Sequence, residues 1–237
     1  MDLIWQGIYK AFYLLITGDP EVLHITQLSL CVSGSATLIA LLLGIPAGVV
    51  LALSQFPGRN ILISVINTGM GLPPVVVGLL VTVMLWRNSL LGFFELLYTP
   101  VAMVLAQVII AFPIVAGLTI AALQALNPNL KLQLVGLGAS RFQMALCLIR
   151  EARLTLLAAV MAGFGGVISE VGAVLMVGGN IKGQTRVLTT ATVLETRMGN
   201  FDVAIALSVL LLLLTFIVNF VLTRIQQREH VAWPLLK

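Results

Sequence analysis

The chain has 237 residues, of which 59% are apolar and only 9% are charged, with a formal net charge of +4 at pH 7. A water-soluble domain of this length needs far more charged surface, so the composition excludes a soluble globular protein and indicates a protein of the lipid bilayer. The two cysteines and two histidines form no CxxC or HExxH pattern, which excludes a metal or redox enzyme built on such motifs.

The N-terminal segment, residues 1–23, begins with mostly apolar residues interrupted by Lys10, and its apolar and aromatic residues recur at helical spacing. This pattern predicts an external helix that lies along the membrane surface with its aromatic rings at the level of the headgroups. The alternative is a sixth membrane span, against which the shortness of the segment and its internal lysine argue.

Five apolar segments follow, each longer than the roughly 20 residues that a helix needs to cross the hydrocarbon core. They cover residues 25–53, 61–86, 100–123, 154–177 and 203–222. The sequence therefore predicts an all-α integral membrane protein with five transmembrane helices in a single domain, residues 24–237.

Glycine and proline interrupt the second segment most densely in residues 69–74, which read Gly-Met-Gly-Leu-Pro-Pro. Pro73 and Pro74 cannot donate backbone hydrogen bonds, so the carbonyls they free must be satisfied by neighbouring helices or by water in a cavity. The run predicts either a bend that lines a pathway or a kink that helps helices pack.

A basic, polar loop covers residues 126–153 and contains Lys131, Arg141, Arg150, Glu151 and Arg153. Asn127 followed by Pro128 predicts the start of one short helix, and apolar residues at helical spacing after Ser140 predict a second, amphipathic helix. Gly136 and Gly138 permit a turn between the two. Such a unit suits a contact in which a helix enters a groove of another protein, and the alternative is a membrane-surface helix.

Glu170 lies in the middle of the fourth segment and is the only ionisable residue that we place within a span. An intramembrane carboxylate is costly and normally faces the protein interior. It either helps to gate a two-state helix interface or is a satisfied structural acid. Direct contact with an anionic substrate is disfavoured because an ionised carboxylate repels an anion.

Residues 178–201 begin with turn residues and continue as a short, threonine-rich amphipathic segment. The pattern predicts an outer gate or a docking surface for a soluble partner, and the alternative is an ordinary solvated loop.

The distribution of lysine and arginine predicts the orientation of the five spans. One side of the membrane receives Arg59, Lys131, Arg141, Arg150, Arg153, Arg224, Arg228 and Lys237. The other side receives Lys10, Arg87, Lys182, Arg186 and Arg197. The first side is therefore cytoplasmic, with the N-terminus outside and the C-terminus inside. This asymmetry accounts for the basic character of the chain without any nucleic-acid partner.

The central residues of the basic loop, Gly138-Ala139-Ser140-Arg141, resemble the second half of a motif in the permease subunits of type I ATP-binding-cassette importers. The first half of that motif, Glu-Ala-Ala, is replaced here by Leu132, Gln133 and Leu134, and the Leu-Pro at its end is absent. Residues 150–201 are similar to the tungstate permeases of the molybdate, tungstate and sulfate importer group, most specifically in residues 170–181, which read Glu-Val-Gly-Ala-Val-Leu-Met-Val-Gly-Gly-Asn-Ile.

This resemblance implies a homodimer of the chain, with a pathway at the dimer interface, in the cell membrane of a bacterium or an archaeon. It implies an external oxyanion-binding protein and two cytoplasmic ATP-binding subunits. The residues implied in contact with the ATP-binding subunits are Gly138, Ala139, Ser140, Arg141 and Phe142. ATP and Mg would lie on those partners, because this chain lacks a GxxxxGK[ST] phosphate loop. The chain would hold no catalytic residue, metal or cofactor of its own.

The identity of the transported anion stays open, because tungstate, molybdate and sulfate are all tetrahedral dianions. The candidate pathway and gate residues are Ser169, Glu170, Thr189, Thr190, Pro73 and Pro74. A secondary transporter is a second hypothesis, which predicts paired intramembrane charges or an inverted repeat of broken helices. A membrane-embedded enzyme is a third, and it requires clustered catalytic side chains at membrane depth.

Overall fold

The computed structural model describes residues 2–89 and 91–230. Residues 1, 90 and 231–237 lie outside the described residues, and with them the expected last residues of the membrane domain, including Lys237. Within the described residues the secondary structure consists of α-helices and one short 3-10 turn, without strands. The predicted all-α class is confirmed.

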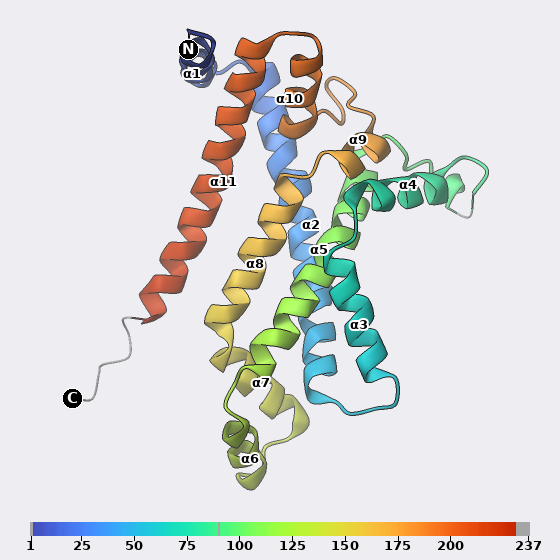
Figure 1. Ribbon diagram of the computed structural model, residues 1–237, viewed down its shortest axis with the longest axis vertical. Helices are drawn as coiled ribbons and strands as arrows, with labels where there is room; N and C mark the ends of the chain where they lie inside the picture. The colour runs from blue at the N-terminus through green and yellow to red at the C-terminus, as the bar shows by residue number, and fades with distance from the viewer. Residues whose placement is uncertain (1, 90, 231–237) are drawn as a thin grey trace.

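Helices in the first half of the chain are α1 (Asp2–Thr17), α2 (Pro20–Leu53), α3 (Arg59–Met70), α4 (Pro74–Leu85), the 3-10 turn η1 (Gly92–Phe94) and α5 (Pro100–Gln124). The second half forms α6 (Pro128–Gly136), α7 (Arg141–Glu151), α8 (Arg153–Ile168), α9 (Gly172–Gly178), α10 (Leu188–Arg197) and α11 (Phe201–His230). Helices α2, α5, α8 and α11 run along the long axis of the molecule (Figure 1). Helices α6 and α7 lie beyond one end of this bundle, and α1 and α10 lie at the other.

In the described part of the chain, three helices are long and apolar enough to cross a membrane: α2, α5 and the Phe201–Gln227 part of α11. Two further pairs meet the same criteria only as bent pairs, with α3 and α4 at 103° and α8 and α9 at 56°. Counting each bent pair as one span gives up to five. The bend expected at Pro73 and Pro74 is confirmed. The fourth predicted span, residues 154–177, is broken within the bundle, because α8 ends at Ile168 and α9 begins at Gly172.

The centre of the bundle is the crossing of α2 and α5, where glycines allow the two backbones to approach closely. A Cβ added at Gly48 would lie 2.6 Å from Thr119 Cβ, and one added at Gly44 would lie 2.9 Å from Val115 Cγ1. In lipid, helices gain little from the hydrophobic effect when they associate, so close packing of small residues supplies much of the attraction. The α2–α5 pair therefore forms the frame on which the other helices pack.

Helix α1 is seen nearly end-on beside the upper end of α11, so it lies across the direction of the long helices (Figure 1). Gly7 faces Ile205 of α11 so closely that an added Cβ would meet Ile205 Cγ2 at 2.4 Å. Lys10 Nζ donates to Asp202 Oδ2 at 2.6 Å. Trp5 and Tyr9 are exposed on the remaining surface of α1. This arrangement favours the interfacial helix over the sixth span.

Candidate functional site

The first candidate site is the turn between α6 and α7. Asn127 Oδ1 accepts a hydrogen bond from Asn129 N at 2.9 Å, and Pro128 occupies the first turn of α6, where its missing N–H leaves no unsatisfied donor. The helix start predicted at these residues is confirmed. Helix α6 has no buried residue, and its half-buried Leu130 and Leu134 pack against the core cluster at this end of the bundle.

Gly138 ends α6 with a left-handed backbone, φ +74°. Its N–H donates to Val135 O and the N–H of Ala139 donates to Leu134 O, both at 3.0 Å. This pair of bonds is a Schellman motif, which satisfies the last carbonyls of a helix and strongly favours glycine at the left-handed position. The predicted turn at Gly138 is therefore confirmed with a specific geometry.

Ser140 begins α7 with a reciprocal capping box. Its Oγ accepts from Gln143 N at 3.3 Å, and its own N–H donates to Gln143 Oε1 at 2.9 Å. Two otherwise unsatisfied N–H groups are thereby paired at the start of the helix. Arg141 and Phe142 follow on the first turn of α7, and both side chains are exposed.

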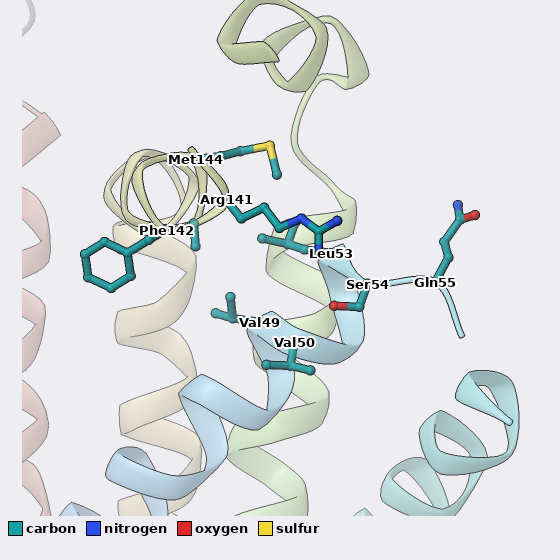
Figure 2. A pocket seen from close by; sticks show the side chains of 9 residues that line it. Val49, Val50, Leu53, Ser54, Gln55, Arg141, Phe142 and Met144 are labelled. Carbon is teal, nitrogen blue, oxygen red and sulfur yellow. The ribbon is translucent and has the colours of Figure 1, made fainter. Parts of the chain in front are cut away.

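A groove of 580 Å³ separates this first turn of α7 from the end of α2. Figure 2 shows Arg141 extending from α7 toward Leu53 and Ser54, whereas Phe142 points away from α2. The end of α2 presents unpaired carbonyls and the negative end of the helix dipole, which favour a nearby cation. Arg59 Nε already donates to Leu51 O there at 2.6 Å.

Packing of α7 onto the bundle agrees only in part with the apolar pattern of its sequence. Leu148 is fully buried and belongs to a core cluster that includes Val49 and Leu123. Of the three apolar residues that recur at helical spacing after Ser140, Phe142 and Leu146 are exposed, whereas Ile149 packs against this cluster. Leu137 in the preceding turn is 84% exposed. Exposed apolar side chains at the end of a bundle are suited to contact with another protein.

The second candidate site is the break between α8 and α9, where the structure places Glu170. Its Oε1 accepts from Ala173 N at 2.9 Å, so the carboxylate caps the first turn of α9. The side chain is half-buried and belongs to a helix break rather than to the middle of a helix. Ser169, which is exposed, donates its hydroxyl to Gly165 O at 2.8 Å.

The break that contains Glu170 lies beside the break that contains Pro73 and Pro74. A Cβ added at Gly172 would lie 2.8 Å from Val75 Cγ2, and one added at Gly78 would lie 2.7 Å from Ala173 Cα. Helices α4 and α9 therefore pack backbone to backbone, immediately beyond their respective breaks.

The two candidate threonines lie on the first turn of α10, which is inserted into the protein. Thr189 donates its hydroxyl to Glu170 O at 3.1 Å, so these two predicted residues are brought together. Thr190 is 1% exposed and its hydroxyl pairs with the backbone of Val187. This first turn of α10 is buried, so residues 178–201 are more than a solvated loop.

Sequence reasoning missed a buried polar group on α5. Gln107 is 3% exposed, and its Nε2 donates to Val167 O at 3.1 Å on the last turn of α8. It lines a small pocket of 10 Å³ together with Ser29, Ser33 and Thr189. An amide within an apolar span is costly, and that cost is the signal that identifies it in the sequence. Among residues 2–89 and 91–230, no cluster of His, Cys, Asp or Glu side chains is arranged to hold a metal ion.

Comparison with known proteins places these features in context. Residues 44–231 match the family model described as "Binding-protein-dependent transport system inner membrane component". The tungstate uptake system permease protein TupB of Peptoclostridium acidaminophilum is 41% identical over 229 residues, which cover 96% of this chain and 100% of that protein. The probable anion ABC transporter permease protein of Haloferax volcanii is 42% identical over 212 residues, which cover 87% of this chain and 91% of that protein.

A solved structure has the same fold. The crystal structure of an amino acid ABC transporter with histidines superposes with a TM-score of 0.67 at 20% identity, covering 92% of this chain and 98% of that chain. The arrangement of helices described above is thus that of an ABC transporter membrane subunit.

Proposed function

The chain belongs to the family of binding-protein-dependent transport system inner membrane components, and we propose from this that it is the membrane-spanning subunit of an ATP-driven tungstate importer. The family resemblance recognised in Gly138-Ala139-Ser140-Arg141 and in residues 170–181 is confirmed. The protein is a type I permease of the molybdate, tungstate and sulfate group. Tungstate is proposed because a protein named as a tungstate permease is similar over nearly the whole chain.

The proposed topology has five crossings, with α3–α4 and α8–α9 each counted as one bent span. The N-terminus and the interfacial helix α1 lie outside, and the α6–α7 unit lies inside, as the basic residues favour. The protein then resides in the cell membrane of a bacterium or an archaeon, with an external oxyanion-binding protein on the side of α1 and α10.

The α6–α7 turn is the proposed contact with an ATP-binding subunit. One observation supports this assignment above the others: a rigidly capped turn exposes Leu137, Arg141 and Phe142 at the end of the bundle where α6 and α7 lie (Figure 1). Two copies of the chain would present two such turns to two ATP-binding subunits. Closure of those subunits would move the turns and switch the pathway between its inward-open and outward-open states.

The proposed pathway lies beside the paired breaks, between two copies of the chain. Ser169 is exposed there and offers a hydroxyl, while Pro73 and Pro74 set the bend opposite. Glu170 and Thr189 are proposed as gate residues, because their hydrogen bond joins α10 to the break. Thr190 remains a candidate gate residue whose hydroxyl is engaged by its own helix turn.

The experiment that tests this function is competitive uptake in reconstituted vesicles. They would contain this chain, an ATP-binding subunit and an external binding protein, with tungstate, molybdate and sulfate supplied with and without ATP. We expect ATP-dependent uptake with tungstate preferred. ATP-dependent uptake that prefers another anion would correct the substrate and retain the architecture. Uptake by this chain alone, indifferent to ATP, would favour a secondary transporter and overturn the proposal.

A further inference from the structure

The break between α8 and α9 is held by side chains from two other helices. Gln107 on α5 donates to Val167 O just before the break, and Thr189 on α10 donates to Glu170 O within it. A bent helix leaves carbonyls without their usual partners, and in lipid such carbonyls must be paired by neighbouring side chains. These two bonds therefore satisfy the backbone at the bend and stabilise it.

Both donors lie at the edge of the same small pocket, and one acceptor in it has no partner. Gln107 Oε1 is buried and makes no hydrogen bond among the described residues. Thr189, whose hydroxyl is a donor, lines that pocket together with Gln107 and Ser29. An unpaired buried acceptor costs free energy, so an arrangement of these side chains that pairs Gln107 Oε1 would be more stable.

Helix α10 is itself tied to the outer end of α2. Leu188 N donates to Ser29 Oγ at 2.8 Å at the start of α10. In the turn before it, Lys182 and Arg186 pair with Glu21 of α2 at 2.6 and 3.4 Å. The segment from Lys182 to Thr190 is thus fixed both at the outer surface and at the buried break. A displacement at its outer surface is therefore transmitted to Thr189.

The other end of α8 adjoins the end of α7, and the α6–α7 turn lies at the start of α7. A single residue, Ala152, separates α7 from α8 and is 2% exposed. Helix α8 has 16 residues, which corresponds to about 24 Å of rigid rod. A helix that joins two sites in this way transmits a change of bend at one end as a change of position at the other.

We propose that Gln107 and Thr189 are positioning residues that latch the external helix α10 to the bend between α8 and α9. In the latched state Thr189 donates to Glu170 O, and in the released state this hydrogen bond is broken. The latch makes the bend sensitive to the position of residues 178–201. Helix α8 carries this sensitivity to the α6–α7 turn. The role of that sensitivity in coupling to an external partner rests on the proposed function, whereas the latch itself does not.

Distance measurement between spin labels on α8 and α10 tests the latch in the full chain alone. Ala158 and Thr196 are exposed and supply the two labelled positions, after Cys31 and Cys147 are replaced by serine. Thr189→Val keeps the shape of the side chain but removes the hydroxyl, and Thr189→Ser restores a hydroxyl as the matched control. Gln107→Met removes both polar atoms of the amide.

We expect one dominant distance in the chain without a latch substitution. Thr189→Val and Gln107→Met should each change the ratio of the two label populations by about fivefold, the effect of losing one buried hydrogen bond, while Thr189→Ser leaves it unchanged. If Thr189→Val gives the same distribution as the chain without a latch substitution, the latch is wrong. If Gln107→Met fails to fold, the label distances of Thr189→Val alone test the latch.

A second measurement separates failure of the latch from failure of the proposed function. In vesicles with the ATP-binding subunit, tungstate-loaded external binding protein should stimulate ATP hydrolysis severalfold, and Thr189→Val should reduce that stimulation more than Thr189→Ser does. Absence of stimulation with unsubstituted Thr189 and Gln107 would contradict the proposed function and would leave the label distances to decide the latch. Equal stimulation of the Val and Ser variants would contradict the role of the latch in coupling.

Discussion

Single residues set the α6–α7 turn. Gly138 closes the Schellman motif because its φ of +74° is one that glycine adopts at little cost. Two residues later, Ser140 starts α7 through its exchange of hydrogen bonds with Gln143. Both features could be predicted from the sequence, since each is a local rule linking a residue type to a backbone position. Single residues did not reveal which side chains of α7 are buried against the bundle and which are exposed.

Substitution of Gly138 should impair ATP-driven uptake only by straining the backbone of the α6–α7 turn. An added Cβ meets nothing within 4 Å at Gly138 or at Gly136, so alanine at the two positions differs only in conformation. The positive φ at Gly138 makes alanine there cost about 1–2 kcal/mol, whereas Gly136→Ala in a helix gains up to about 1 kcal/mol. We expect reduced uptake for Gly138→Ala, none for Gly138→Pro and normal uptake for Gly136→Ala in the reconstituted vesicles. Equal uptake by all three variants would contradict the coupling assignment.

Charge reversal at Arg141 separates a contact role from a folding role. Arg141 lies on the first turn of α7, where an acidic residue suits the helix dipole better than a basic one by about 0.3–1 kcal/mol. The gain at the start of α7 is offset by the loss of a cation beside the end of α2, so Arg141→Glu should change the thermal unfolding midpoint of the chain little and still abolish ATP-driven uptake. Arg150→Glu, in the last turn of the same helix, is the matched control and should retain more uptake. An Arg141→Glu variant with full uptake would exclude a contact role for this guanidinium.

The two bent helix pairs, α3–α4 and α8–α9, bend for different reasons. The break between α3 and α4 contains Pro73 and Pro74, which end one helix and begin the next. The break between α8 and α9 has no proline and is stabilised by capping from Glu170 and by hydrogen bonds from Gln107 and Thr189. The first bend could be predicted because its cause is local. The second could not, because two of its three stabilising side chains come from α5 and α10.

The close packing of α4 against α9 predicts that substitution of Gly78 lowers the stability of the chain. Its added Cβ would meet the backbone of α9 at 2.7 Å, so Gly78→Ala must push α4 away from α9. Overpacking of this kind costs about 1–3 kcal/mol. We expect a lower thermal unfolding midpoint for Gly78→Ala in detergent, and an unchanged or higher one for Gly34→Ala, where nothing lies within 4 Å. The same midpoint for both variants would show that α4 and α9 do not pack this closely.

At the scale of the whole molecule, the two ends of the bundle present different kinds of side chain. The end with α1 and α10 has ion pairs that tie separate elements together, Lys10 with Asp202 and Glu21 with Lys182 and Arg186. The end with α6 and α7 exposes basic and apolar side chains next to a groove. Exposed ion pairs contribute little to stability, so their value here lies in fixing which segments meet.

Labelling of single cysteines tests the orientation of the whole chain. Gln184 and Gln133 are exposed at the two opposite ends of the bundle, in the turn before α10 and on α6. In a variant without Cys31 and Cys147, a membrane-impermeant thiol reagent should label Gln184→Cys in intact cells. It should label Gln133→Cys only after the membrane is opened. The reverse pattern would invert the proposed topology.

The sequence by itself determined the class of the protein and the local features that depend on neighbouring residues. Its apolar segments require a bilayer, the prolines predict one bend, and the Asn127, Gly138 and Ser140 positions predict the ends of α6 and α7. These inferences succeed because each rests on residues within a few positions of one another, where backbone sterics and capping are decided.

The tertiary structure alone decided the features that join distant residues. Apolar composition looks the same in a straight span and a broken one, so the 56° bend at Glu170 has no local signal. The burial of Thr189, the bond from Gln107 to Val167 O and the choice of Leu148 as the packing residue of α7 all depend on which helix lies opposite. In lipid, every polar group must find a partner within the protein, and only the packing of the helices shows which partner it is.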